Sequence, residues 1–323
     1  MNIFLTGSAG FVGSHLVKHL QVQGHDVVCH AKQNSHQQNF SGKRQASSID
    51  LFDSFALQQV LQGIDTVIHC AAMVTPWGRE ADFFRHHVLL TQHLLQTAAQ
   101  AGVKQFIYLS CASVAMRHWQ ALLNINESAP LTKLTELAYS RSKGVAEELV
   151  LAASSAKLRT IALRPALIWG RGDIVDRQLG VAAEKGQFAW FNQGDYVFST
   201  CYIENLTHAI SCALSCDLSG EAFFISDGAA LRFRDFMTER LRRGGFPVPQ
   251  FSLATPLARA LARFTENGWK YLPMKGKPPL TREMVRLIGY PFTLDTNKAL
   301  QYLGYQPKYH INEALEKLSR VYT

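Results

Sequence analysis

The sequence predicts an α/β protein whose core is a doubly wound parallel sheet. Short apolar runs alternate with segments of helical periodicity throughout residues 1–165, as where Val12, Leu16 and Leu20 recur every fourth residue just after the apolar run at 3–5. Past residue 165 this rhythm stops, and Gly and Pro interrupt the chain repeatedly. Strands that alternate with helices pair in parallel through right-handed crossovers, so we expect helices on both faces of the sheet.

The expected elements follow one another along the chain. Each strand is a short apolar run, and each helix is a longer segment with one apolar face. Helices are expected at 11–22, 55–61, 83–101 and 139–156, and Gly102 is of the residue type that ends helices. Strands are expected at 3–5, 27–29, near 49, and at 66–68, 106–109, 159–163 and 221–226.

The chain divides into two parts in this interpretation. Residues 1–165 form the sheet domain, and residues 166–323 form a smaller, mixed region that binds substrate and covers the carboxyl edge of the sheet. About 196–227 interleave with the sheet, because 221–226 resembles a returning strand. The basic amphipathic segment 256–264 has Leu257, Leu261 and Phe264 on one face. We expect a lid helix there; contact with a membrane surface and a plain surface helix are the alternatives.

Composition excludes several classes of protein. With 47% apolar and 18% charged residues the chain can bury a large core, which excludes disorder and fibrous architectures. No apolar stretch approaches the roughly 20 residues that a membrane span needs. The six cysteines lack the spacing of zinc ligands or disulfide frameworks, so we expect no metal and a reducing compartment. The chain opens directly into the first strand, and a cytoplasmic location is predicted.

The net charge of +8 lies in the last third of the chain. Residues 228–323 carry 16 Lys and Arg against 7 Asp and Glu, whereas residues 1–227 carry 17 against 18. These basic residues are scattered over segments that look helical, without the interleaved aromatics of a nucleic-acid platform. We therefore expect no nucleic-acid partner.

A glycine motif opens the chain between the first strand and the first helix. Glycines at this place allow a tight turn and the close approach of a pyrophosphate, which then rests on the positive N-terminus of the helix. The sequence therefore predicts a dinucleotide site. Its expected contacts in this turn are Gly7, Ala9, Gly10, Phe11, Val12 and Gly13.

The second strand predicts which dinucleotide binds. Sites for NAD usually place an acid after this strand to bind the ribose 2′-hydroxyl, but the expected position near residue 31 is Ala. Lys32, with Lys43 and Arg44 beyond it, suits the 2′-phosphate of NADP instead. NADP is favoured and NAD is possible. Asp50 and Leu51 are expected to contact the adenine.

A phenol and an ammonium are spaced for catalysis in the fourth expected helix. Tyr139 and Lys143 are four residues apart and therefore share one helix face. Proton transfer at neutral pH needs a tyrosine whose pKa is lowered from about 10, and a close cation lowers it. We expect Tyr139 to act as general acid and base, with Lys143 as its partner.

Taken together, these features resemble the extended short-chain dehydrogenase/reductase superfamily, which includes the NAD-dependent epimerases and dehydratases. The residues that carry the resemblance are Thr6–Gly13, Ile68–Ala72, Tyr139 with Lys143, and Leu163–Gly170. The last of these, followed by Arg171–Asp173, together with Pro278–Arg282 and Leu303–Pro307, looks most like the 3β-hydroxysteroid dehydrogenase branch. The resemblance covers nearly all of the chain.

The resemblance implies an NAD(P)-dependent oxidoreductase. Residues 1–165 would be its NAD(P)-binding Rossmann domain, and helices 83–101 and 139–156 would pair in a homodimer. Lys143 would hold the cofactor's ribose as well as tune Tyr139. Further cofactor contacts implied by the family pattern are Ala71, Ala72, Met73, Ser110, Tyr139, Pro165, Ala166 and Ile168.

Two positions depart from the family pattern. The family places a Ser or Thr just after the strand at 106–109, where this chain has Cys111, a poor hydrogen-bond donor. Either Cys111 substitutes weakly or a hydroxyl of Ser110 or Ser113 takes over, and Ser113 is favoured if the segment stays extended. The family also carries an Asn where this chain has His87, which is either part of a proton relay or a polar residue on the helix surface.

The predicted reaction is hydride transfer between a nicotinamide and a hydrophobic ketone or secondary alcohol, hydroxysteroid-like or β-hydroxyketone-like. Sugar-nucleotide epimerases and dehydratases are the nearest alternative, but the Asp-Glu pair, the Asn and the Arg that they often carry are replaced by Ala112-Ser113, Leu167 and Phe198. A non-catalytic NAD(P)-binding sensor is the other alternative. Residues that either line an apolar substrate pocket or belong to the core are Met73, Val74, Trp77, Met116, Trp119, Trp169 and Trp190.

Overall fold

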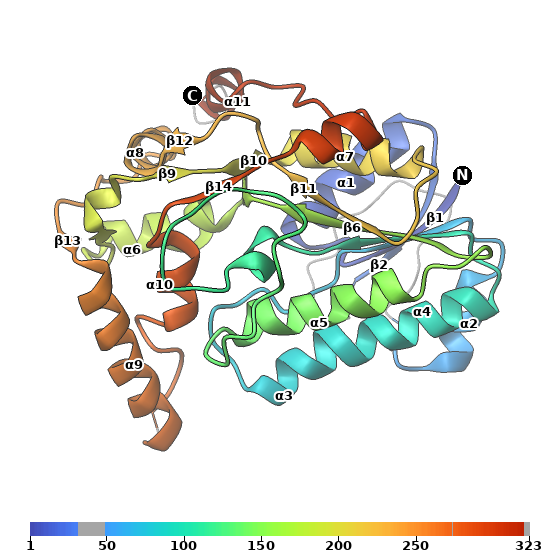
Figure 1. The fold of residues 1–323 in the computed structure, drawn as a ribbon, viewed down its shortest axis with the longest axis horizontal. Coiled ribbons are helices and arrows are strands. Elements are labelled where there is room, and N and C mark those ends of the chain that lie inside the picture. The colour runs from blue at the N-terminus through green and yellow to red at the C-terminus, as the bar shows by residue number, and fades with distance from the viewer. Residues whose placement is uncertain (32–48, 273, 320–323) are drawn as a thin grey trace.

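A six-stranded parallel sheet lies at the centre of the computed structural model, which describes residues 1–31, 49–272 and 274–319 (Figure 1). The strand order is β11-β6-β4-β3-β1-β2, and every neighbouring pair is parallel. The chain leaves β1 toward β2 and returns on the other side of β1 to form β3, which makes a switch point of the kind where α/β proteins bind ligands. The strands are β1 (Asn2–Thr6), β2 (Asp26–His30), β3 (Thr66–His69), β4 (Gln105–Leu109), β6 (Arg159–Pro165) and β11 (Glu221–Ile225).

Helices cover both faces of this sheet. One face carries α1 (Phe11–Val22) and α7 (Ile203–Leu214), which contact each other and bury Leu16, Leu20, Leu206 and Ile210. The opposite face carries α2 (Ser54–Leu61), α4 (Leu90–Gln100) and α5 (Ala138–Ala152), which pack side by side (Figure 1). The predicted doubly wound α/β fold is confirmed.

Two expected elements differ from the prediction. The helix expected at 83–101 is three segments, α3 (Glu80–Phe83), a π-helical stretch Phe84–Leu89 and α4. The wider π turn, which often occurs at functional sites, carries His87 inward, where it is buried. The strand expected near Ile49 stays a prediction, because residues 32–48 lie outside the described part of the chain; Ile49 itself is in no strand, and its carbonyl accepts a hydrogen bond from the His30 side chain at 2.9 Å.

Small elements from the rest of the chain, most of them beyond residue 165, surround the carboxyl edge of the sheet. The division into domains at residue 165 stays a prediction, since β11 lies in the central sheet beside β6. The additional strands are β5 (Leu122–Ile125), β7 (Leu167–Trp169), β8 (Trp190–Phe191), β9 (Val197–Phe198), β10 (Thr200–Tyr202), β12 (Leu231–Arg232), β13 (Ser252–Leu253) and β14 (Phe292–Leu294). The additional helices are α6 (Gly180–Glu184), α8 (Phe233–Arg243), α9 (Thr255–Tyr271), α10 (Arg282–Ile288) and α11 (Ile311–Ser319).

Asp227, which follows β11, joins these small elements to the sheet. It is buried, and its carboxylate accepts four hydrogen bonds of 2.7–2.8 Å. The donors are Trp169 Nε1 in β7, Thr200 Oγ1 and Tyr202 N in β10, and Asn205 Nδ2 in α7. Because both carboxylate oxygens are used twice, one side chain satisfies the polar groups of three elements.

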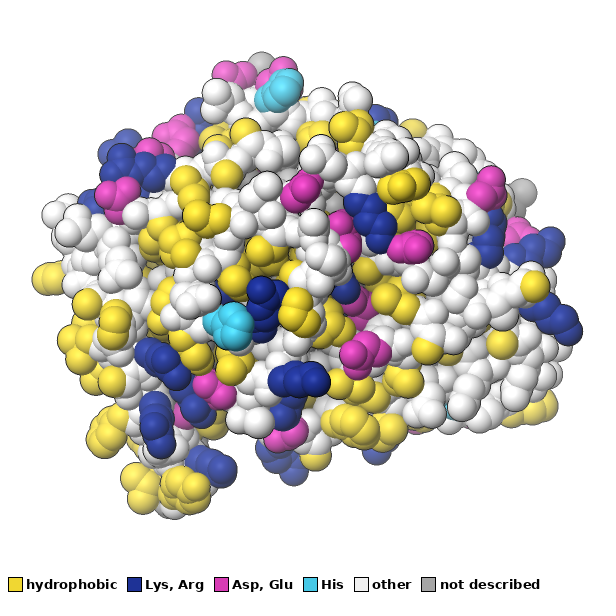
Figure 2. All heavy atoms as spheres, viewed as in Figure 1, with side chains coloured by type: hydrophobic (Ala, Val, Ile, Leu, Met, Phe, Trp, Pro, Cys, Tyr) yellow, Lys and Arg dark blue, Asp and Glu magenta, His cyan; other side chains and the backbone are white. Residues whose placement is uncertain are grey.

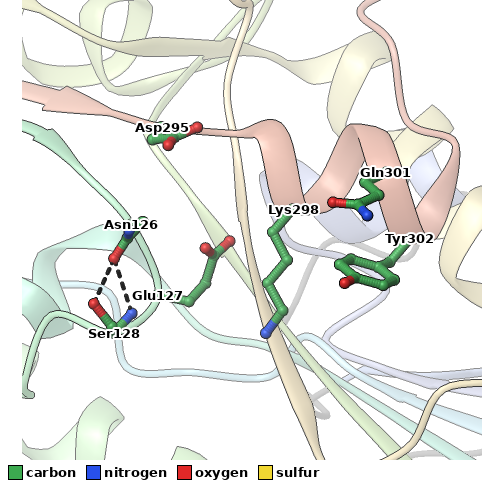
Figure 3. Close-up of a pocket in the computed structure, with 7 residues that line it drawn as sticks. All are labelled: Asn126, Glu127, Ser128, Asp295, Lys298, Gln301 and Tyr302. Atoms are coloured by element: carbon green, nitrogen blue, oxygen red, sulfur yellow. Dashed lines mark hydrogen bonds between the residues drawn. The ribbon is translucent and has the colours of Figure 1, made fainter.

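The free edge of β11 is covered by side chains. Phe224 N donates to the Glu127 carboxylate at 2.7 Å, and Lys298 Nζ donates to the carbonyl of Ala222 at 3.0 Å. A polar hollow of about 480 Å³ lies beside this edge, and Figure 3 shows it between Asn126, Glu127 and Ser128 on one side and Lys298, Gln301 and Tyr302 on the other. Glu127 and Lys298 are thereby engaged in protecting an edge strand, and none of the predicted site residues lines the hollow.

Helix α9 extends away from the body of the protein, where Figure 2 shows apolar and basic side chains at the lower left. Leu257, Leu261 and Phe264 are exposed, whereas the small side chains of Ala258 and Ala262 face inward. Small residues thus make the close approach of α9 to α10, and the large apolar side chains do not pack on the described part of the protein. The lid role of this helix stays a prediction. Among the described residues, no helix has both the length and the apolar character of a membrane span. Cytoplasmic location stays a prediction.

The Asp227 cluster predicts a large effect of an isosteric change. Asp227→Asn places an amide N–H₂ where two of the four donors need an acceptor, so we expect the free energy of unfolding to fall by about 2–4 kcal/mol. Urea denaturation measures this change. Asp195→Asn is the matched control, because Asp195 forms a solvent-exposed ion pair with Arg232. Its loss should lower the free energy of unfolding by less than about 1 kcal/mol. Equal losses in the two variants would contradict the role of Asp227.

Candidate active site

The predicted site residues gather at the carboxyl ends of β1, β3, β4 and β6. Parallel strands bring these ends to one edge of the sheet, so residues far apart in sequence become neighbours. The glycine turn follows β1, Ala71 and Ala72 follow β3, Cys111 follows β4, and Pro165 ends β6. Helix α5 adds Tyr139 and Lys143 from one face of the sheet.

The turn after β1 has no room for side chains at two of its glycines. Gly7 has a φ of +74°, and a Cβ there would lie 2.8 Å from the backbone nitrogen of Ala71. A Cβ on Gly13 would lie 2.1 Å from the carbonyl oxygen of Gly7. Gly10 is exposed at the start of α1, whose first turn no described side chain caps. A turn that is this tight at Gly7 and Gly13, and that no side chain caps, fits the diphosphate of a dinucleotide.

The other residues predicted to contact the dinucleotide differ in how far they are exposed to a ligand. Ala9, Phe11 and Val12 are half-buried at the turn. Asp50 is exposed, but Leu51 packs in the core between β2 and α2, so only its backbone is left for a ligand. Lys32, Lys43 and Arg44 lie outside the described residues.

His87 links the end of β3 to the helix that carries Tyr139. Its Nε2 accepts a hydrogen bond from Met73 N at 3.0 Å, so the proton of the neutral ring is on Nδ1. Nδ1 donates to Ser142 Oγ at 2.8 Å, and Ser142 Oγ donates to the carbonyl of Tyr139 at 2.9 Å. Burial, with the nearby charge of Lys143, lowers the pKa of His87 to about 3. His87 is thus a buried neutral connector rather than a residue of the helix surface.

Tyr139 is half-buried near the start of α5, with its ring edge-on to those of His87 and Phe83 at 5.6 and 6.3 Å. Burial raises the pKa of Tyr139 well above its usual value, and the neighbouring Cys111 adds to the effect. A phenol in this environment keeps its proton at neutral pH.

Lys143 is directed to the backbone of β4 rather than to the phenol. Its Nζ donates to the carbonyl of Leu109 at 2.6 Å and lies 4.0 Å from the centre of the Tyr108 ring. Burial lowers the pKa of Lys143 to about 8. The expected lowering of the Tyr139 pKa by Lys143 is therefore not seen in this arrangement, because burial dominates at both groups.

Cys111 and Ser113 lie together beyond the end of β4. The segment Ala112–Ala115 is a 3₁₀ turn, so the extended backbone on which the choice of Ser113 rested is absent. The Cys111 thiol nevertheless lies 3.1 Å from Ser113 Oγ. Cys111 is half-buried as a residue, and Ser113 is buried. Burial raises the pKa of Cys111, so it stays a thiol.

The residues expected on the nicotinamide side follow β4 and β6. Ser110 N donates to the carbonyl of Leu163 at 2.8 Å, but its buried Oγ has no hydrogen-bond partner among the described residues. An orphaned hydroxyl at the edge of the sheet fits a polar ligand. Pro165 is the last residue of β6, Ala166 N donates to the carbonyl of Ile225 at 2.9 Å, and Ile168 is half-buried in β7.

Three residues considered for the substrate pocket belong to the core. Met116, Trp169 and Trp190 are at most 2% exposed, and both Trp rings are surrounded by aromatic neighbours. Met73, Trp77 and Trp119 are half-buried and Val74 is exposed. Of the residues considered, these four are therefore the ones left to line an apolar substrate pocket.

Sequence reasoning missed three residues of the site. Ser140 and Ser142 lie within the Tyr139–Lys143 segment. Ser140 is hydrogen-bonded to Ser113, and Ser142 to His87. Glu283, from α10, accepts hydrogen bonds from Ser140 N at 3.2 Å and Ser140 Oγ at 2.5 Å. The serines could have been found from the helical repeat that aligns them with the site, but no local signal in the sequence places Glu283 beside α5.

Known proteins match this chain over nearly its whole length. A ketoreductase of a 4-hydroxy-2-methyl-3-oxo-4-farnesyl-3,4-dihydroquinoline-1-oxide from Stigmatella aurantiaca is 29% identical over 98% of this chain and 96% of its own. A 2-alkyl-3-oxoalkanoate reductase from Stenotrophomonas maltophilia is 30% identical, over 98% of both chains. The structure of a dTDP-glucose 4,6-dehydratase from Streptomyces venezuelae with NAD bound has the same fold, with a TM-score of 0.77 and 21% identity over 100% of this chain and 97% of that one.

A family model decides the classification. The model of the 3-beta hydroxysteroid dehydrogenase/isomerase family matches residues 4–255, which include the glycine turn, the Tyr139–Lys143 pair and β11. The resemblance predicted from the sequence is confirmed. The chain belongs to the 3-beta hydroxysteroid dehydrogenase/isomerase family, and it is an NAD(P)-dependent oxidoreductase of the extended short-chain dehydrogenase/reductase type.

Proposed function

We propose that this oxidoreductase interconverts a hydrophobic ketone and its secondary alcohol, with Tyr139 as the general acid and base. The observation that carries the proposal is the half-buried phenol of Tyr139 beside the Cys111 thiol at the carboxyl edge of the sheet. A phenol whose pKa is raised holds its proton at neutral pH, which suits donation to a developing alkoxide.

The residues around Tyr139 divide the remaining tasks. A bound nicotinamide supplies or accepts the hydride, and the glycine turn with Ser110 suits binding of that dinucleotide. Lys143 is fixed by Leu109 and Tyr108, so its cation stays at the end of β4. Cys111 is the group placed to orient the substrate oxygen, with Ser113 behind it. His87 and Ser142 hold the backbone of Tyr139 in position.

The substrate class rests on the apolar lining and on the relatives. Met73, Val74, Trp77 and Trp119 offer apolar surface near the end of β3 and beyond β4. The reductases from Stigmatella and Stenotrophomonas act, by their names, on ketones with farnesyl or alkyl chains. We infer a 3-oxo compound with a large apolar substituent. Solved epimerases and dehydratases share the fold at identities too low to carry a substrate.

We also propose a homodimer through the outer face of α5 and the π-helical stretch. Phe84, Leu89 and Val145 are 47%, 41% and 37% exposed there, so two neighbouring helical segments present apolar side chains to a partner. Sedimentation equilibrium is expected to give a dimer for the natural chain and a monomer for Val145→Glu, because a buried unpaired carboxylate opposes association. A natural chain that sediments as a monomer would refute the dimer.

Loss of the Tyr139 hydroxyl separates an enzyme from a sensor. Tyr139→Phe is expected to lower the rate of NADPH-dependent reduction of a 2-alkyl-3-oxoalkanoate by about 10²–10⁴-fold and to leave NADPH binding within about twofold, because only proton transfer is removed. Tyr108→Phe is the matched control. Tyr108 is also a buried phenol beside Lys143, but its hydroxyl has no hydrogen-bond partner among the described residues. Full turnover in Tyr139→Phe would exclude Tyr139 as the acid.

Preference for NADP is proposed from Lys32. We expect NADPH to bind at least about tenfold more tightly than NADH, a difference of about 1.4 kcal/mol, because a lysine after β2 neutralises the 2′-phosphate. Titration followed by nicotinamide fluorescence measures both constants at fixed salt. Lys32→Ala should lose the preference, and Lys18→Ala, a change at an exposed position on α1, should keep it. Equal affinities in the natural chain would remove the preference for NADP.

A further inference from the structure

Glu283 caps the helix that carries Tyr139. It is 3% exposed, lies in the first turn of α10, and accepts hydrogen bonds from the backbone N–H groups of Tyr139 and Ser140. The N-cap residue of α5 is Leu137, whose side chain makes no capping hydrogen bond. The carboxyl group therefore satisfies N–H groups at the start of α5 from a segment 143 residues away.

A line of hydroxyl groups connects Glu283 with the thiol of the site. Glu283 Oε1 lies 2.5 Å from Ser140 Oγ, which lies 2.8 Å from Ser113 Oγ, which lies 3.1 Å from Cys111 Sγ. Cys111 also neighbours Tyr139, whose pKa it raises. We call Glu283, Ser140, Ser113 and Cys111 the serine chain. Ser113, Ser140 and Glu283 are buried.

Each serine hydroxyl has one proton to donate, so the direction of the hydrogen bond at Glu283 fixes the direction of the bond at Cys111. An ionised Glu283 only accepts, so Ser140 donates to it, Ser113 donates to Ser140, and Cys111 donates to Ser113. All protons then point away from the substrate. Cys111 presents only a sulfur lone pair, which can accept from an alcohol but cannot donate to a carbonyl.

Protonation of Glu283 on Oε1, the oxygen that faces Ser140, reverses every bond. Its O–H donates to Ser140, Ser140 donates to Ser113, and Ser113 donates to Cys111 Sγ, which leaves the Cys111 S–H free to donate to a substrate oxygen. A carbonyl oxygen carries no proton and needs such a donor. Each group only rotates its own O–H or S–H bond, and the one proton exchanged is that of Glu283.

We propose that Glu283 is a positioning residue that sets the direction of the serine chain, so that its acid form prepares the site for the ketone and its ionised form for the alcohol. This inference rests on the proposed ketone–alcohol function for its meaning in catalysis. The switching of the chain itself follows from the geometry of the four side chains and needs no substrate.

The surroundings of Glu283 allow both forms near neutral pH. Burial and the nearby carboxylate of Glu266 raise its pKa to about 7, while the hydrogen bonds from Ser140 and Tyr139 oppose the rise. Glu266 itself is bonded to Arg282 at 2.6 Å. On the other side lie the un-ionised Tyr139 and Cys111, each of which senses the charge of Glu283, and then Lys143 beyond Cys111.

Infrared spectroscopy of the free protein tests the switch. As pH rises through about 7, the acid C=O band of Glu283 is expected to disappear while the S–H band of Cys111 shifts, with the same midpoint. The two bands are assigned by their loss in Glu283→Gln and Cys111→Ala. An S–H band of Cys111 that stays fixed while Glu283 titrates would overturn the proposal.

Two further variants distinguish the switch from a purely structural cap. Ser140→Ala removes one link but keeps the backbone donors to Glu283, so the C=O band should still titrate while the S–H band no longer follows it. Glu266→Gln keeps every link and should move both midpoints to lower pH together, because a neighbouring negative charge is removed. An S–H band that follows the titration unchanged in Ser140→Ala would also refute the proposal.

Kinetics then connect the switch with the reaction. Reduction of a 2-alkyl-3-oxoalkanoate by NADPH should slow by about tenfold as Glu283 ionises, and the Glu283→Gln variant should lack this step in its pH profile. In Glu283→Gln the amide oxygen accepts the hydrogen bond from Ser140 N, so the hydrogen bonds of the serine chain keep the direction that they have when Glu283 is ionised. If no ketone is reduced but the infrared bands remain coupled, the proposed function fails while the switch stands. If ketone reduction shows no such step while Glu283 titrates, the switch has no catalytic role and this inference is wrong.

Discussion

The start of α5 is the point on which the rest of the site depends. Helix α5 delivers Tyr139 and Lys143 to the carboxyl edge of the sheet, and its first N–H groups are satisfied by Glu283 from the C-terminal third of the chain. Without that carboxyl group, buried donors at the helix start would have no acceptor from α10. The small C-terminal elements therefore do more than cover the site, because one of their side chains fixes where the catalytic helix begins.

The parts of the fold that the sequence predicted are those with strong local signals. Apolar runs separated by helical periodicity predict the parallel sheet, and the glycines at 7 and 13 predict a turn in which side chains clash with Ala71 and with Gly7 itself. The Tyr139–Lys143 spacing likewise predicts a shared helix face, and both residues lie at the sheet edge. Each of these features depends on residues close together in sequence.

The features that could not be predicted depend on distant packing. Trp169 and Trp190 are core residues because aromatic side chains from α8 and other segments surround them, which hydrophobicity alone does not reveal. Leu257 is exposed because the smaller Ala258 makes the close contact of α9. Glu283 looks like an ordinary first-turn acid of a short helix, and only the tertiary structure turns it toward Ser140.

The two departures from the family pattern are compensated locally, which favours retained chemistry over a sensor. His87 is bonded at both ring nitrogens, to Met73 N and to Ser142, so the substitution leaves neither of them unsatisfied. Cys111 is a weak donor, but Ser113 lies directly behind it and is itself backed by Ser140. A protein that only bound a dinucleotide would have no need to keep a buried polar network around Tyr139, because unsatisfied buried groups are costly and apolar replacements are cheaper. The network makes physical sense if protons around Tyr139 and Cys111 must be oriented for a reaction.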